Sequence, residues 1–153
     1  MSYDATLGGG GWTVGDIKPP IQGATGFPAA GTAGHPAGAV PVASTSTTVN
    51  ATSSPSLPAA AGKTTYLTGV HISGLSATTL TGVAATVGNT LGGDVRIYVD
   101  VPAVASKGAI NPVEIVFNPP LPATAVNTAI SGNLPAFGAG SAAQTMTLIG
   151  FQL

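Results

Sequence analysis

The sequence has no cysteine and very few charged residues. Of its 153 residues, 6% are charged, and the net charge is -1. Without cysteine, neither a disulfide nor a thiolate metal site is possible. The basic residues Lys18, Lys63, Arg96 and Lys107 are scattered singly, whereas capture of nucleic acid or of an anionic membrane needs clustered Lys and Arg. We therefore expect neither a nucleic-acid partner nor a membrane partner.

The shortage of charge also bears on the state in which the protein works. A soluble surface normally carries roughly 25–35% charged residues, which give it colloidal protection. This chain is 44% hydrophobic, and Ala, Thr, Ser and Gly take the place of the missing charged residues. We infer that much of its surface is covered in a larger assembly. The charge-free spans 64–93 and 115–153 are broken every few residues by Gly, Thr, Ser, Asn or Pro, so neither is expected to be a transmembrane helix.

The clearest structural pattern lies at residues 94–101. Four β-branched residues alternate with polar ones there, namely Val95, Ile97, Val99 and Val101 against Arg96, Tyr98 and Asp100. Side chains on a strand point to opposite faces in turn, so this pattern predicts a strand with one buried face. We expect residues 63–153 to be organised around it, with Arg96 and Tyr98 on the exposed face.

Further strands are predicted at 64–73, 80–87, 113–117, 125–131 and 144–153. The proline-rich run 118–122 cannot join a central ladder and is expected to be a rigid loop at a sheet edge. In the last strand Met146 and Leu148 share one face while Ile149 and Phe151 share the other, which predicts a bulge near Gly150. Short strands with Gly and Pro turns, and no useful helical pattern, indicate an all-β sandwich.

Residues 1–62 have no convincing periodicity and contain many glycines and prolines, which disfavour a packed core. One interpretation is a disordered tail. The other is an extended arm that becomes ordered against neighbouring subunits, with isolated apolar residues such as Trp12 and Phe27 as anchors. The predicted division is therefore an arm at 1–62 and a β-sandwich domain at 63–153.

No catalytic or metal-binding constellation stands out. Residues 61–64, Ala-Gly-Lys-Thr, resemble the end of a phosphate loop, but Leu57 occupies the position of its first glycine. His35 and His71 are the only imidazoles and lie far apart in the sequence. Asp94 and Asp100 share a strand face with Arg96, which favours a solvated face or an intersubunit ion pair over an acid and base pair. We expect no enzyme activity, no cofactor and no metal.

From residue 63 onward the chain resembles small proteins encoded with tailed-bacteriophage virion genes. The resemblance lies in the stretches 64–69, 115–123, 127–130 and 134–140, which read TTYLTG, IVFNPPLPA, NTAI and LPAFGAG, and in the hydrophobic end. The similar functional class is the capsid decoration, or cement, proteins of tailed phages, several of which are jelly-roll-like modules. The resemblance implies a jelly-roll-like antiparallel β-sandwich or barrel on the outer capsid surface, with no catalytic residues.

This resemblance also implies partners. They are the major capsid protein and neighbouring copies of the chain itself, in a dimer or trimer. Aromatic residues and Arg dominate interface energetics, so the predicted partner-binding residues are Trp12 and Phe27 in the arm, and Arg96 and Tyr98 on the exposed strand face. Two rival hypotheses remain open. One is a fibre or host-binding adhesin module that recognises its target through loops such as 132–141, and the other is a small hydrolase.

Overall fold

The computed structural model describes residues 5–6, 11–12, 35–75, 77–78, 81–103, 108–140 and 143–153. The chain forms two compact units, Met1–Ala39 and Val40–Leu153. In the first unit, strand β1 (Ala5–Thr6) pairs antiparallel with β2 (Gly11–Trp12). Throughout the described ranges the regular structure is β-strand, and no helix occurs.

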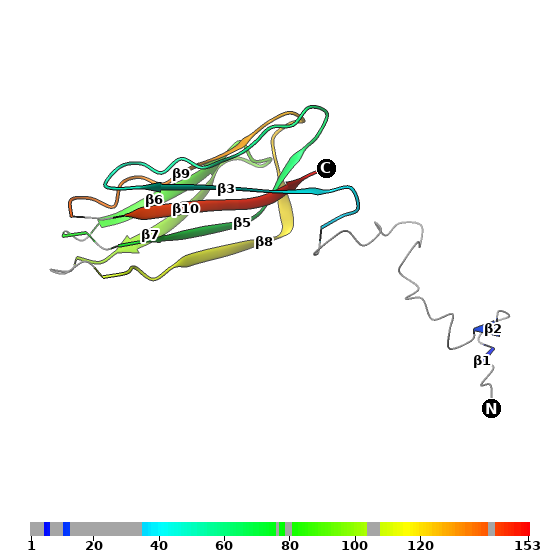
Figure 1. Ribbon diagram of the computed structural model, residues 1–153, viewed down its shortest axis with the longest axis horizontal. Helices are drawn as coiled ribbons and strands as arrows, with labels where there is room; N and C mark the ends of the chain where they lie inside the picture. The colour runs from blue at the N-terminus through cyan, green and yellow to red at the C-terminus, as the bar shows by residue number, and fades with distance from the viewer. Residues whose placement is uncertain are drawn as a thin grey trace. The chain divides into compact units, whose positions relative to one another are not determined.

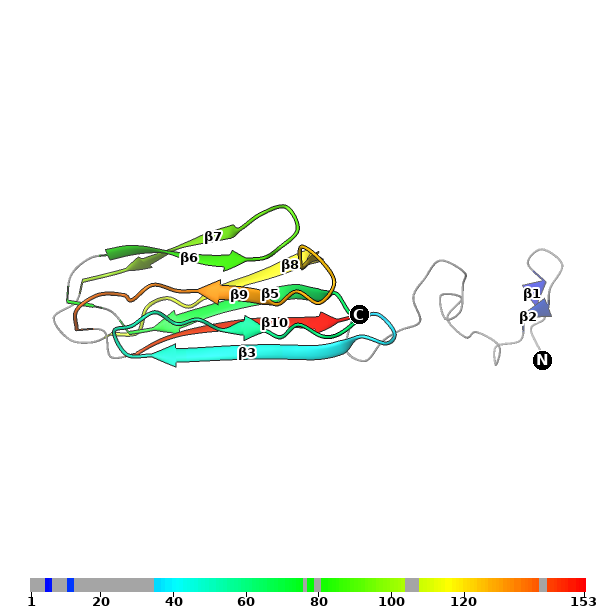
Figure 2. The same cartoon turned by 90° about the horizontal axis from the view of Figure 1, so that it is seen from above.

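The second unit consists of two four-stranded sheets (Figures 1 and 2). The first sheet has the order β3 (Val40–Thr48), β10 (Gln144–Gln152), β5 (Thr65–Gly74) and β8 (Val113–Pro122). The second sheet has the order β4 (Ser56–Leu57), β9 (Ile130–Asn133), β6 (Thr81–Gly88) and β7 (Val95–Val101). All neighbouring strands are antiparallel.

The strand order of this unit is that of a jelly roll. Its first strand pairs with its last (β3 with β10), and the next pairs inward are β4 with β9, β5 with β8, and β6 with β7. This unit is thus a long antiparallel hairpin that folds over on itself, which distributes the strand pairs alternately between the two sheets. The predicted jelly-roll-like β-sandwich is confirmed. The sheets stay open at their edges, so the alternative of a closed barrel does not hold.

The core lies between the inward faces of the two sheets. Its fully buried side chains come from both, and the largest are Phe137, Leu57, Leu67, Ile72, Ile130, Leu134, Met146 and Leu148. Strand β7 alternates as predicted, because Ile97, Val99 and Val101 are buried while the residues between them are exposed. Burial of these apolar side chains, at about 25 cal/mol per Å², is the main stabilising contribution.

The boundary predicted after residue 62 is corrected by the structure. Residues 40–62 belong to the sandwich, because β3 pairs with β10 over its whole length and Leu57 is fully buried. The sequence of β3 shows no apolar alternation, because its inward positions include Ser44 and Ser46. The hydroxyls of these serines accept hydrogen bonds from the backbone N–H groups of Ser56 (3.0 Å) and Ser54 (3.2 Å). Polar contacts therefore join β3 to residues 54–56, where the chain enters β4.

Two other local predictions are also corrected. Residues 118–122 do lie at a sheet edge, but they continue strand β8 rather than forming a loop, with Leu121 opposite Leu67 and Pro122 opposite Tyr66. An edge strand uses one side only for pairing, so it tolerates proline. The strand predicted at 125–131 begins only at Ile130, because a turn with Asn127 at φ 60° precedes it.

The bulge predicted near Gly150 is confirmed. The register between β10 and β5 shifts between Ile149 and Gly150, so that Thr68 of β5 has no direct partner on β10. A Cβ on Gly150 would fall far inside contact distance of the carbonyl oxygen of Tyr66 and lie 3.0 Å from Leu57 Cδ1. Glycine is therefore required here because the two backbones approach closely.

We expect Gly150→Ala to lower the free energy of unfolding by about 3 kcal/mol or more, since the added methyl group meets backbone that cannot move aside. Gly82→Ala is the matched control, because a Cβ on Gly82 of β6 meets nothing within 4 Å. That control should change the free energy by less than about 1 kcal/mol. Denaturant unfolding measures both, and equal midpoints for the two variants would contradict the account of Gly150.

Candidate interaction surfaces

Arg96 and Tyr98 lie on the outer face of strand β7, as the alternation predicts. Tyr98 is 76% exposed. On the neighbouring strand β6 they stand opposite Thr86 and Ala84, and Asp100 stands opposite Gly82. The small residues of β6 leave the phenol ring of Tyr98 standing above the sheet. The partner-binding role of Arg96 and Tyr98 stays a prediction.

Strand β7 is also the terminal strand of the second sheet. In the described part of the chain it pairs with β6 alone. An edge strand presents a row of backbone N–H and C=O groups that can pair with another strand. Arg96 and Tyr98 therefore border an open sheet edge, which the alternation in the sequence does not reveal.

The two other predicted anchors lie in the first unit. Trp12 belongs to β2, where its backbone pairs with that of Ala5. Phe27 lies outside the described residues. Their role as anchors stays a prediction.

The outer face of the first sheet is covered with hydroxyl and apolar side chains in cross-strand rows. Thr45 and Thr147 share a hydrogen bond of 3.0 Å between their hydroxyls, and Thr47 and Thr145 share one of 2.9 Å. At the other end of this face the rings of Tyr66 and Phe151 stack, with centroids 4.9 Å apart and planes inclined by 14°. These rows join the β3, β10 and β5 strands across their outer face.

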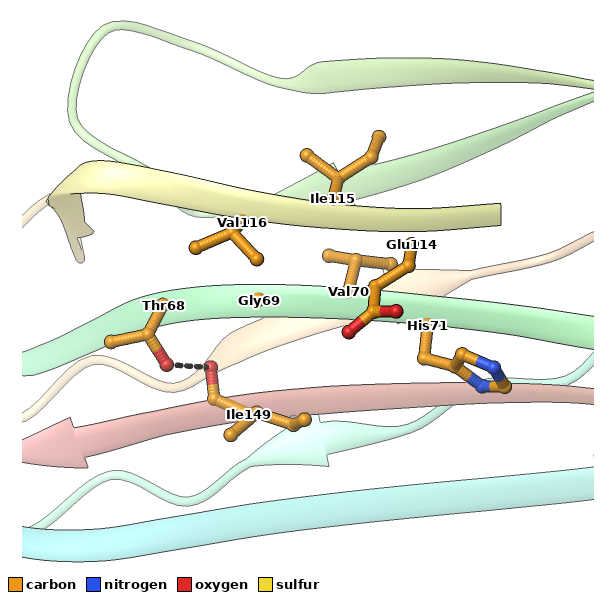
Figure 3. A pocket seen from close by; sticks show the side chains of 8 residues that line it. All are labelled: Thr68, Gly69, Val70, His71, Glu114, Ile115, Val116 and Ile149. Carbon is orange, nitrogen blue, oxygen red and sulfur yellow. Dashed lines mark hydrogen bonds between the residues drawn. The ribbon is translucent and has the colours of Figure 1, made fainter. Parts of the chain in front are cut away.

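A hollow of about 210 Å³ lies on this face above Gly69 (Figure 3). Because Gly69 has no side chain, a gap separates Ile149 of β10 from Val116 of β8, which stand on the same cross-strand row. Val116 is 74% exposed and Ile149 is 45% exposed. His71 and Glu114, which are cross-strand neighbours, close one end of the hollow.

This face is almost uncharged. Glu114 is the single Asp, Glu, Lys or Arg in strands β3, β5, β8 and β10. Its exposed apolar and hydroxyl groups suit contact with another neutral protein surface, because covering them removes apolar area from water without desolvating charges. No local pattern in the sequence indicates this surface, since the face is assembled from four strands far apart in the chain.

The structure does not bring the candidate catalytic residues together. His71 faces outward from the first sheet, whereas Asp100 belongs to β7 of the second sheet and Asp94 directly precedes that strand. Among the described residues no group of three or more His, Cys, Asp or Glu side chains could hold a metal ion. Nor does that part of the chain contain a helix long and apolar enough to cross a membrane.

Residues 61–64, which resemble the end of a phosphate loop, include a turn that is held in place by hydrogen bonds. The N–H of Gly62 donates to Asn127 Oδ1 (2.6 Å), and the carbonyl of Lys63 accepts a hydrogen bond from Asn127 N (2.9 Å). These contacts tie the turn before β5 to the turn before β9. They give residues 61–64 a structural role.

The loop proposed for recognition at 132–141 is anchored to the core. Leu134 and Phe137 are fully buried. The buried side chain of Gln144 holds the loop, since its Oε1 accepts from Phe137 N (2.7 Å) and its Nε2 donates to the carbonyls of Leu134 (3.2 Å) and Pro135 (2.8 Å). Leu134 and Phe137 thus serve packing, and the exposed positions include Asn133, at the end of β9, Ala139 and Gly140. Residue 141 lies outside the described residues.

Comparison of the chain with protein-family models, with curated proteins and with solved structures found no match.

We expect the exposed face of the first sheet to be dispensable for folding. Val116→Asp should lower the free energy of unfolding by no more than about 1 kcal/mol, the span of the strand-propensity scale. Leu148→Ala, which empties a fully buried position, should cost about 2–5 kcal/mol. Denaturant unfolding compares the two. A loss at Val116 as large as that at Leu148 would show that the outer face supports the fold.

Proposed function

We propose that this chain is a structural virion protein that decorates and cements the outer surface of a tailed-phage capsid. The observation that carries the proposal is the nearly uncharged outer face of the first sheet, with Val116 and Ile149 exposed on it. A free surface of this kind lacks colloidal protection, so it suits a module that spends its working life against other proteins. The jelly-roll fold and the resemblance of residues 63–153 to virion proteins support the same proposal.

The proposed mechanism is preferential binding to the assembled shell. A module that contacts two or more neighbouring copies of the major capsid protein binds the lattice more tightly than it binds free subunits. That difference in affinity stabilises the assembled state by mass action. No bond is made or broken, so the proposed activity needs no catalytic group.

The proposed contacts divide between the sandwich, residues 40–153, and residues 1–39, which we call the leader. The first-sheet face lies against the shell. Residues 1–39 contact neighbouring subunits, with Trp12 and Phe27 as anchors. Tethering makes the second contact effectively intramolecular, so two weak contacts can add to firm attachment.

Electron cryomicroscopy of the particle that contains this chain tests the location. Density for the sandwich on the outer shell, with the first sheet facing the major capsid protein, would support the proposal. Density confined to a tail tip or fibre would overturn it and make host attachment the leading hypothesis.

Substitutions on the proposed contact face test the mechanism. We expect Val116→Asp and Ile149→Asp together to lower capsid occupancy at least tenfold on dilution, because both place a carboxylate in a contact that excludes water. Trp12→Ala with Phe27→Ala should also lower occupancy, by removing the anchors of the leader. Quantitative gel analysis of purified particles measures bound chain.

Ser131→Asp with Asn133→Asp provides the matched control, since both residues are exposed on β9 of the second sheet. This control adds the same charge and should leave occupancy unchanged. Equal occupancy for the control and for the first-sheet variant would contradict the proposed contact face.

A further inference from the structure

The open edge of strand β7 is self-complementary in charge. Its outward side chains are Arg96, Tyr98 and Asp100, so a positive and a negative residue flank a central aromatic residue at equal spacing. We propose that β7 is a dimerisation edge, at which two copies of the chain pair their β7 strands antiparallel about a two-fold axis at Tyr98. The two second sheets then become one continuous sheet of eight strands.

Natural sheets blunt their edges with charged side chains, above all lysine, with proline, with bulges or with very short strands. Strand β7 is suited to pairing because its two charged residues, Arg96 and Asp100, are of opposite sign and the other protections are lacking. Strand β7 has seven residues, none of which is Pro, Gly or Lys, and it pairs with β6 in an unbroken register. Figure 2 shows β7 at the margin of the sandwich.

The other sheet edges are less suited. Strand β8 carries Pro119, Pro120 and Pro122, which cannot donate backbone hydrogen bonds. Strand β4 has only two residues. Strand β3 is long, but it contains Pro41 and no charged residue that would select a register or a partner. Charge complementarity is therefore found at β7.

The arrangement about Tyr98 places opposite charges together twice. Arg96 of each copy stands opposite Asp100 of the second copy, and the two Tyr98 residues stand opposite each other. Directly opposite side chains on antiparallel strands lie about 4.5–5.5 Å apart at Cβ, where opposite charges and aromatic pairs stabilise the sheet. On the inward face Ile97 meets Val99 of the second copy, which continues the apolar layer across the axis.

Other registers lose these contacts or oppose like charges. A shift by two residues in one direction sets Asp94 against Asp100, and in the other it leaves both Arg96 residues opposite Pro102. A shift by four residues sets either the two Arg96 residues or the two Asp100 residues against each other. A shift by one residue places inward side chains opposite outward ones, because strand side chains alternate with a period of two. The register centred on Tyr98 is thus selected by charge.

The proposed dimer is closed. In a two-fold interface both copies use the same patch, so the free edge of each β7 strand is fully paired with that of one partner. The far edge of the joined sheet is β4 in each copy, whose two residues offer too short an edge for further pairing. This inference does not depend on the capsid proposal, because it concerns the isolated chain.

Sedimentation of the purified full-length chain over a concentration series tests the dimer. We expect a reversible dimer, and Arg96→Asp or Asp100→Arg alone should raise its dissociation constant at least tenfold by creating two like-charge pairs. The double variant with both substitutions should restore dimerisation, since the charges are again complementary. Glu114→Arg, which makes the same charge change as Asp100→Arg but on β8, should leave the constant unchanged.

Cysteine cross-linking gives a second test that does not rely on charge. The chain contains no cysteine, so Tyr98→Cys supplies the single thiol, and the two-fold axis brings it opposite its counterpart. Oxidation in dilute solution should link Tyr98→Cys at least tenfold faster than Val116→Cys, whose position is equally exposed, at 74% against 76%.

Circular dichroism verifies that each variant is folded. A chain that stays monomeric to millimolar concentration would overturn the inference. So would a dimer that ignores the charge reversals or that the double variant fails to restore, or equal rates of cross-linking at the two positions. The dimer is measured on the isolated chain, whereas capsid occupancy is measured on purified particles. Failure of the dimer and failure of the capsid proposal are therefore distinguishable.

Discussion

The fold depends on the insertion of β10 between β3 and β5. The nine residues of this strand are paired with β3 on one side and with β5 on the other, and its Met146 and Leu148 are fully buried. It is the last strand of the sandwich, whereas its partners lie about 100 residues earlier in β3 and about 80 residues earlier in β5. The first sheet therefore closes only when distant parts of the chain meet, which is the costly step in forming jelly-roll folds because loop-closure entropy is lost first.

The strands that can be predicted from the sequence are those whose two faces differ. Strand β7 has a buried and a solvated face, so Ile97 and Val99 alternate cleanly with Arg96 and Tyr98, and the phase change at Gly150 is visible because β10 alternates too. Strand β3 was missed because its inward Ser44 and Ser46 bind backbone N–H groups instead of filling an apolar core. Hydrogen bonds of this kind leave no periodicity of hydrophobic residues to detect.

The candidate surfaces were predictable to a different extent. The exposure of Arg96 and Tyr98 follows from the alternation alone. That β7 lies at an edge, and so offers a second partner its backbone, depends on which strands pair, and no local pattern contains that information. The same holds for the hollow over Gly69, whose apolar borders Val116 and Ile149 come from strands that meet only through β5.

The antiparallel pairing of β3 with β10 has a mechanical consequence. Val40, where the sandwich begins, is paired with Gln152, next to the last residue of the sequence. The chain therefore enters β3 and leaves β10 at the same end of the sheet. Tension between the leader and residue 153 would break the backbone hydrogen bonds between β3 and β10 one after another, starting at Val40 and Gln152. It would not load all of these bonds at the same time. Under such a pull β3 would peel from the sheet first, and the pairing of β10 with β5 would remain to carry the load.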